Sequence, residues 1–168
     1  MRLDEFDIKI LAVLQGNGRI TKLKLAEQIG LSPSPCWERM RRLEEAGYIR
    51  GYHAEIDLNR IVRTSTVFVE VALKSHEAVD FARFERAVLG VPEVVECYAI
   101  GGGIDYLLKV VTTDIADYQQ LIDDLLQTDI GISRYFTYIV TKPIKAERVY
   151  PLKSLLARGQ ASAPAPQK

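Results

Sequence analysis

The residues best suited to bind a partner form a basic cluster between positions 19 and 42. Six side chains there are basic and two are acidic: Arg19, Lys22, Lys24, Arg39, Arg41 and Arg42 against Glu27 and Glu38. This local excess of positive charge suits phosphate groups, although the whole chain is neutral, with 22 basic and 22 acidic residues. Charge alone does not separate a phosphate-binding patch from an ordinary solvated helix face.

Three predicted helices must position this cluster. The first is the apolar pattern from Phe6 to Leu14. Capping and breaking residues set the limits: Gly16-Asn17-Gly18 after the first helix, Thr21 and Gly30 around the second, and Ser32-Pro33 and Gly47 around the third. Two helices joined by a short glycine-containing turn, after a support helix, indicate a helix-turn-helix over residues 1–50.

The third helix has two different faces. Cys36, Met40 and Leu43 recur on one side, and the opposite side is polar and basic except for Trp37. The second helix of such a motif enters the major groove of DNA, where Arg, Glu and Ser side chains can hydrogen-bond base edges. We therefore predict contacts to double-stranded DNA from Lys22, Lys24, Ser32, Ser34, Trp37, Glu38, Arg41 and Arg42. The alternative is a solvent face with one stray tryptophan.

The spacing of apolar residues changes in the second half of the chain. Residues 51–63 form a predicted connector, and the stretch from Tyr48 to Ile56 suits a small wing or linking strand. Residues 64–150 then alternate as strands at 66–73, 94–100, 105–111 and 132–141 and helices at 78–89 and 115–126. This βαββαβ order predicts a ferredoxin-like domain, which makes the whole chain α+β. In the C-terminal tail, residues 151–168, we expect disorder from Ala157 onward.

A run of three glycines, Gly101-Gly102-Gly103, precedes Asp105 between two predicted strands. Glycines permit close approach of a ligand to the backbone, but spacing alone favours a flexible hairpin turn. Asp105 could bind the amino group of a small molecule, or it could only fix the turn or cap a neighbouring strand.

The sequence offers no signature of an enzyme or of a metal protein. We find no catalytic constellation, and neither Cys36 and Cys97 nor His53 and His76 have ligand-like spacing. We therefore expect no enzymatic activity, no cofactor and no metal. We find no apolar run long enough to span a bilayer, and the first residues do not suit a signal peptide. These features predict a cytoplasmic protein with no membrane partner.

Residues 3–145 closely resemble the Lrp/AsnC family of transcriptional regulators. The resemblance is carried by LDEFDIKILAVLQGNGRIT, by LSPSPCWERMRRLE at Leu31 to Glu44, by PEVVECYAIGGGIDYLLKV and by YFTYIV. It implies a winged helix-turn-helix, an effector-binding and oligomerisation domain, and dimers through the sheets that can assemble into octamers. It also implies an amino acid or derivative bound between dimers by residues matching the family's effector region: Gly101, Gly102, Asp105, Ile115, Tyr138, Ile139 and Val140. The chain departs from the family at Gly103, where an acidic residue is common.

These observations predict a DNA-binding transcriptional regulator that responds to a small effector. One alternative is an enzyme-associated amino-acid sensor without DNA binding. Another is an assembly protein whose basic helix binds nothing.

Overall fold

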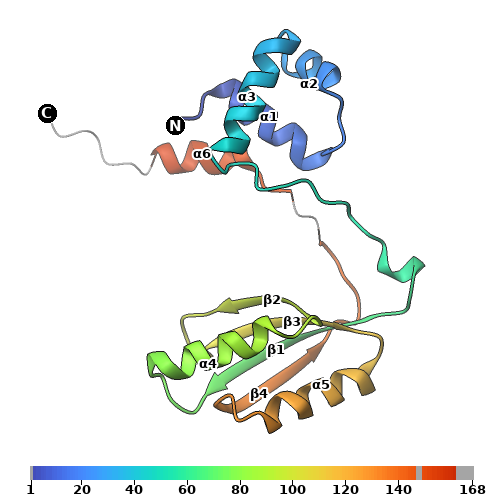
Figure 1. Cartoon of the computed structure of the whole chain (residues 1–168), viewed down its shortest axis with the longest axis vertical. Helices are drawn as coiled ribbons and strands as arrows, with labels where there is room; N and C mark the ends of the chain where they lie inside the picture. Colours follow the sequence, from blue (N-terminus) through green and yellow to red (C-terminus); the bar gives the residue numbers. More distant parts are fainter. Residues whose placement is uncertain (1, 147–148, 162–168) are drawn as a thin grey trace, which may run out of the picture. The chain divides into compact units, whose positions relative to one another are not determined.

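The computed structural model describes residues 2–146 and 149–161, which divide into two compact units. Among these residues, one unit contains those through Glu55 and those from Lys145 onward, and the other runs from Ile56 to Ile144 (Figure 1). The first unit comprises α1 (Glu5–Gly16), α2 (Lys22–Ile29), α3 (Pro33–Glu45) and α6 (Leu152–Ala161). The second comprises a 3-10 turn (Leu58–Arg60), β1 (Ser65–Leu73), α4 (Ala78–Leu89), β2 (Val94–Ala99), β3 (Tyr106–Thr112), α5 (Ile115–Gln127) and β4 (Ile132–Ile139).

The three N-terminal helices form where their capping residues predict. The Thr21 hydroxyl accepts a hydrogen bond from the Lys24 N–H, and Gly30 ends α2 in the left-handed conformation at φ 77°. Ser32 occupies the N-cap of α3, but its side chain makes no capping hydrogen bond. The helices enclose a small apolar core made of Ile10, Leu25, Ala26, Ile29, Cys36 and Leu43. Burial in this core raises the pKa of the Cys36 thiol.

The C-terminal helix α6 is the main departure from the predicted elements. The composition from Ala157 onward predicted disorder, but α6 extends through Ala161; residues 162–168 lie outside the described part of the chain. Its segment joins the helix-turn-helix unit, because the Gln15 side chain accepts from the Tyr150 N–H at 2.8 Å and donates to the Tyr150 carbonyl at 3.3 Å. These two bonds fix the start of the C-terminal segment to the end of α1.

The predicted wing or linking strand between Tyr48 and Ile56 is not formed. Residues 50–57 have no regular secondary structure and are exposed. A strand is defined by hydrogen bonds to a neighbouring strand, and every pairing in the sheet joins β1, β2, β3 and β4 among the described residues. This segment therefore lies outside the sheet.

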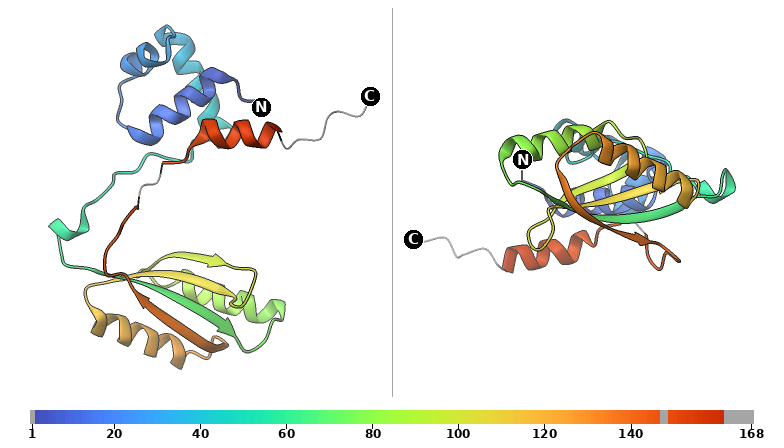
Figure 2. Two further views of the ribbon diagram at one scale, coloured as in Figure 1. Left: turned by 180° about the vertical axis from the view of Figure 1, so that it is seen from behind. Right: turned by 90° about the horizontal axis from the view of Figure 1, so that it is seen from below.

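The second unit is a four-stranded antiparallel sheet with strand order β2-β3-β1-β4. This order confirms the ferredoxin-like arrangement expected from the βαββαβ sequence. Helices α4 and α5 lie on one face of the sheet (Figures 1 and 2). The strands alternate accordingly: Val67, Val69 and Val71 of β1 are buried with Phe84 beneath the helices. The other face carries exposed Phe136 and Tyr138 of β4, which lie beside Glu70 and Phe68 of β1, respectively.

Candidate DNA-binding surface and effector pocket

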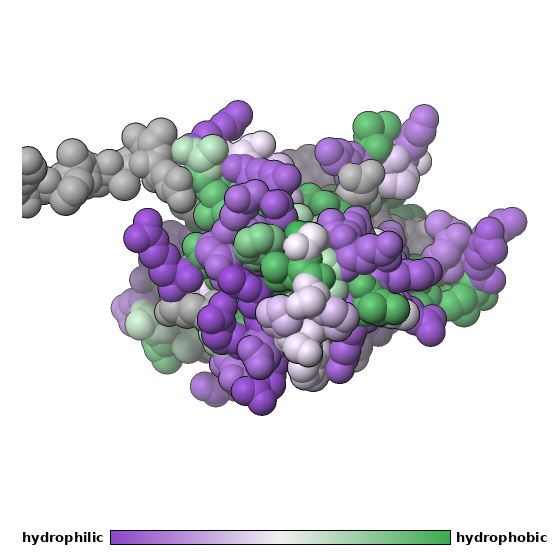
Figure 3. Space-filling model, turned by 90° about the horizontal axis from the view of Figure 1, so that it is seen from above, coloured by the Kyte–Doolittle hydropathy of each residue, from purple (hydrophilic) through white to green (hydrophobic). Residues whose placement is uncertain are grey.

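Helix α3 presents the polar face that the sequence predicts. Cys36 and Leu43 are buried, whereas Ser34, Trp37, Glu38 and Arg41 are exposed on the other side. Hydrophilic side chains surround a few apolar ones on the face of this unit seen in Figure 3. Side chains with this mixture of donors, acceptors and positive charge can hydrogen-bond base edges or phosphates.

Helix α2 supplies Lys22 and Lys24, the two lysines predicted to contact DNA. Both Lys22 and Lys24 are exposed. The ammonium nitrogen of Lys22 lies 3.0 Å from the centre of the Trp37 ring, so the tryptophan holds it by a cation–π interaction. Trp37 is therefore more than a stray apolar side chain, because it joins the two helices of the motif at the surface.

Arg39 is separated from the basic cluster by ion pairs inside the unit. Its guanidinium lies 2.6 Å from the Asp4 carboxylate and 2.8 Å from the Asp7 carboxylate, and the Asp7 side chain is only 1% exposed. The two acids also form a reciprocal capping box at the start of α1. The backbone N–H of Asp7 and the Arg39 guanidinium lower the pKa of Asp4, and both acids raise the pKa of Arg39. Arg39 is therefore a structural link between α1 and α3.

The neighbouring arginines keep more freedom. Arg42 is exposed, and its guanidinium lies 3.5 Å from Asp7, at the margin of the same network. Arg41 pairs with Glu45 one turn along α3 at 3.3 Å, with both side chains about two-thirds exposed at 66% and 64%. An exposed pair at this spacing is worth only about 0.3–0.5 kcal/mol, so Arg41 can exchange Glu45 for a DNA group at little cost.

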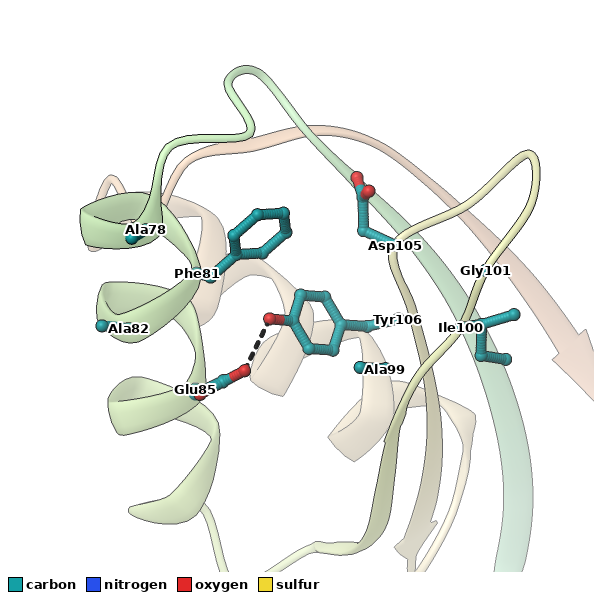
Figure 4. A pocket seen from close by; sticks show the side chains of 9 residues that line it. All are labelled: Ala78, Phe81, Ala82, Glu85, Ala99, Ile100, Gly101, Asp105 and Tyr106. Atoms are coloured by element: carbon teal, nitrogen blue, oxygen red, sulfur yellow. Dashed lines mark hydrogen bonds between the residues drawn. The ribbon is translucent and has the colours of Figure 1, made fainter.

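A pocket lies in the second unit between α4 and the ends of β2 and β3 (Figure 4). It is an open cavity of about 580 Å³, lined by Ala78, Phe81, Ala82, Glu85, Ala99, Ile100, Gly101, Asp105 and Tyr106. The Phe81 and Tyr106 rings form an aromatic wall with centroids 6.1 Å apart. The Tyr106 hydroxyl donates to Glu85 at 2.8 Å, and burial with this bond raises the pKa of Tyr106. The lining includes two carboxylates and no basic side chain, so its charge favours a cationic group.

Asp105 sits at the rim of this pocket with both carboxylate oxygens engaged. One accepts from the Leu73 N–H at 2.7 Å, and the other lies 3.0 Å from the His76 imidazole, which is itself 5.9 Å from the Phe81 ring. The carboxylate therefore fixes the end of β1, as the simpler interpretation expects. Each oxygen retains acceptor capacity, because a carboxylate can accept about four hydrogen bonds.

The glycine loop has a more specific geometry than its composition indicates. Of its three glycines, Gly102 alone has a positive φ, at 142°. A Cβ atom built on any of the three would meet nothing within 4 Å, so the loop is open to approach from outside. The hairpin and ligand interpretations are therefore compatible, since the loop bends at residues 101–103 and leaves all three glycines exposed.

Known protein families match both units of the chain. The model of the Lrp/AsnC ligand binding domain matches residues 66–150, and a model of winged helix-turn-helix DNA-binding domains matches residues 3–50. The chain belongs to the Lrp/AsnC family. It is 57% identical over 145 residues to the transcriptional regulatory protein DoeX of Halomonas elongata, covering 86% of this chain and 92% of that protein.

Further Lrp/AsnC relatives agree over nearly the whole chain. The leucine-responsive regulatory protein of Escherichia coli K12 is 38% identical over 143 residues, covering 85% of this chain and 87% of its own. A transcriptional regulator of Neisseria meningitidis, solved in complex with L-methionine, superposes with a TM-score of 0.86 at 36% identity and covers 92% of this chain and 99% of its own. These matches confirm the predicted family, the α+β fold and the predicted function as a DNA-binding transcriptional regulator with a ligand-binding domain.

The effector residues predicted from the Lrp/AsnC resemblance do not form one cluster within the subunit. Gly101 and Asp105 line the pocket at the end of the sheet where β1 finishes. Ile139 and Val140 lie at the other end, because Ile139 pairs with Val67 and the Val140 N–H bonds to Thr66. Ile115 begins α5 just beyond that end, and Tyr138 lies on the exposed sheet face, where its hydroxyl donates to Glu70 at 3.1 Å.

Sequence reasoning missed most of the pocket wall. Phe81, Glu85 and Tyr106 of the lining, and His76 beside Asp105, were not among the predicted site residues. One signal was available: Ala78, Phe81, Ala82 and Glu85 recur at the three- and four-residue spacing of one helix face. The partnership of His76 with Asp105 had no local signal, since it depends on how α4 meets the sheet.

Proposed function

We propose that this Lrp/AsnC regulator reads a specific DNA sequence through α3 and that an amino acid or close derivative modulates that binding from the pocket beside Asp105. The exposed face of α3, with Trp37, Glu38 and Arg41 beside Lys22, is the observation that carries the proposal. Since DNA is its partner, the protein would act in the cytoplasm as a regulator and not as an enzyme.

To test sequence-specific DNA binding, duplexes that the protein binds are first selected from a random pool. Fluorescence anisotropy then measures the affinity of each variant for the selected duplex and for a scrambled one. We expect Arg41→Ala to lose about 1–3 kcal/mol on the selected duplex and much less on the scrambled one, because base contacts carry the specificity. Arg86→Ala, on exposed α4 surface, is the matched control. Failure to enrich any duplex would favour the sensor without DNA binding, and equal losses on both duplexes would restrict Arg41 to phosphate contact.

The assembly proposal follows from the exposed sheet face. Two helices cover one face and leave Phe136 and Tyr138 half exposed on the other, at 51% and 50%. Apolar sheet faces are stable when another layer covers them. A second copy pairing face to face would bury both rings, so we propose a homodimer, with larger assemblies up to an octamer built from it.

The two separated groups of effector residues support a site shared between copies. Ile139 lies beside Val67, whereas Asp105 bonds to the backbone of Val71 and Leu73. Val67 and Val71 are four residues apart on a strand, or about 13 Å. One amino acid cannot touch both groups in a single subunit. We propose that the loop at Gly101 of one copy faces Ile115, Ile139 and Val140 of another.

Effector binding is testable by thermal shift with a panel of amino acids, because a ligand that binds only the folded state raises the melting temperature. For the strongest ligand, Ile139→Ala should weaken binding if the site spans copies, and Ile144→Ala, also exposed, serves as the control. Unchanged binding in Ile139→Ala would place the effector wholly within the pocket beside Asp105.

A further inference from the structure

Trp37 is the large apolar side chain that α3 exposes. It is 38% exposed, and its neighbours on the same helix face, Ser34, Glu38 and Arg41, are exposed and polar. The buried residues of α3 lie on the opposite side, against the core of the unit. Trp37 is the fifth residue of α3, and the N-terminal residues of a recognition helix are those that contact base edges. The indole ring is therefore placed among the side chains that read DNA.

Lys22, the first residue of α2, holds this ring in one orientation. Its ammonium nitrogen lies 3.0 Å from the centre of the Trp37 ring, in a cation–π contact. One face of the ring is thereby occupied, so the ring cannot stack a base on that face and presents its edge to a partner. The ammonium has three N–H donors, so it can hold the ring and still donate to a phosphate.

The major groove offers an indole edge one kind of apolar partner. Each base pair presents hydrogen-bond donors and acceptors there, and thymine adds its 5-methyl group, the apolar contact by which proteins distinguish it. The polar side chains around Trp37 suit the donors and acceptors of the other bases. Trp37 and Arg41 are four residues apart, which corresponds to about 6 Å along the helix. Successive base pairs are about 3.4 Å apart, so the two side chains reach positions one or two base pairs from each other.

We propose that Trp37 reads the 5-methyl group of a thymine, one or two base pairs from the base that Arg41 reads, and that Lys22 positions the indole ring for this contact. This inference rests on the proposed DNA reading by α3 and adds a specificity-determining residue to it. The contrasting role for Trp37 is a cation–π link that only joins α2 to α3, and such a link would be indifferent to the methyl group.

The experiment uses the full chain and the duplex selected from the random pool. Each thymine is replaced in turn by uracil, which removes the methyl group and keeps the Watson–Crick edge, and affinity is measured by fluorescence anisotropy. At one thymine near the Arg41-dependent base, wild type should lose affinity about fourfold, because burying one such group contributes about 0.8 kcal/mol and about 1.4 kcal/mol is tenfold. In Trp37→Ala the same replacement should change affinity by a factor near one. Leu156→Ala, an equally exposed apolar residue on α6 at 38%, should keep the wild-type factor.

Two substitutions of Lys22 test its positioning role. Lys22→Gln removes the charge that holds the ring and should lower the thymine-to-uracil factor, whereas Lys22→Arg keeps a cation and should retain it. A lysine that only contacts phosphate would weaken binding to both duplexes equally, because phosphate contacts carry no base information. An unchanged factor in Lys22→Gln would therefore overturn the positioning role.

The outcomes distinguish this inference from the proposed function. If Arg41→Ala loses base preference but no thymine is sensitive to its methyl group, the role of Trp37 is wrong and DNA reading by α3 stands. The role is equally wrong if a methyl-sensitive thymine stays sensitive in Trp37→Ala with a wild-type circular dichroism spectrum. Trp37→Gln gives the same comparison if the alanine variant fails to fold. Failure to enrich any duplex would refute the proposed DNA reading, and thymine recognition with it.

Discussion

Replacing Arg39 with alanine should destabilise the helix-turn-helix unit without removing a DNA contact. Arg39 joins Asp4 and Asp7 at 2.6 Å and 2.8 Å, and Asp7 is 1% exposed. Removing one partner of a buried ion pair costs about 3–5 kcal/mol, since the other charge is left in a poorly solvated site. Here the cost is smaller, because Asp7 keeps the Asp4 N–H at 3.1 Å and has Arg42 at 3.5 Å. We therefore expect a loss of about 2–3 kcal/mol.

The assay can follow this unit alone. Trp37 is the only tryptophan in the chain, so its fluorescence during urea unfolding reports on the helix-turn-helix. A loss of about 2–3 kcal/mol should lower the midpoint by about 1–2 M urea. Arg41→Ala is the matched control, because its pair with Glu45 is exposed and should change stability by less than about 0.5 kcal/mol.

The two arginine variants should behave in opposite ways. Arg39→Ala should unfold early and, below its unfolding transition, retain the affinity for DNA. Arg41→Ala should unfold with wild type and bind DNA weakly. If Arg39→Ala kept the wild-type midpoint but lost DNA affinity, Arg39 would belong to the DNA-binding surface and the ion-pair argument would be wrong.

Three other predictions concern the cap, the loop and the open sheet face. The pKa of Asp4 is lowered from its ordinary value of 3.8, so its carboxylate stabilises the fold above pH 3.8, and this contribution is lost as the pH falls through the lower native pKa. The stability advantage of wild type over Asp4→Asn should therefore shrink below about pH 3.8 in acid titrations followed by Trp37 fluorescence. A difference that stays constant with pH would contradict this prediction. Gly102→Ala should lower the melting temperature through about 1–3 kcal/mol of backbone strain at φ 142°, whereas Gly101→Ala should match wild type; equal effects would show that the loop is not strained. Phe136→Glu should yield monomers in light scattering with an unchanged circular dichroism spectrum, and a persistent dimer would move the interface away from the open sheet face.

Local signals were sufficient for most of the architecture. The helix at 78–89 was predicted with the bounds that the structure gives, because Gly90 and Pro92 stop it and its apolar spacing is regular. Apolar alternation located all four strands to within two residues of their ends. Helix α6 was missed because Ala, Pro and Gln dominate the last residues, although Leu152, Leu155 and Leu156 have helical spacing after Pro151.

The roles of charged side chains depended on contacts between distant residues. Arg39 and Arg41 look alike in the sequence, yet one is held by acids thirty-two and thirty-five residues away and the other by its own helix. Asp105 and His76 likewise meet only because α4 begins beside the end of β1. Pairings of this kind have no periodic signature. The sequence pattern could therefore predict which surface binds DNA, but not which of its charged residues are structural and which are free to bind.

The topology of the effector unit also constrains how a ligand can reach the DNA-binding unit. Both covalent connections leave from one end of the sheet, where β1 begins at Ser65 and β4 ends at Ile139. The glycine loop lies at the opposite end, beyond Leu73, about 26 Å along β1. Between these two ends of the sheet, β1 is hydrogen-bonded to β3 and β4, and its side chains that face the helices are buried. A close-packed core of this kind has little freedom to adopt a second arrangement. In the proposed assembly, contacts between copies would switch as rigid bodies, and the exposed loop would be one of these contacts. A ligand bound at that loop therefore has a more direct route to DNA binding through the assembly of subunits than through the interior of one.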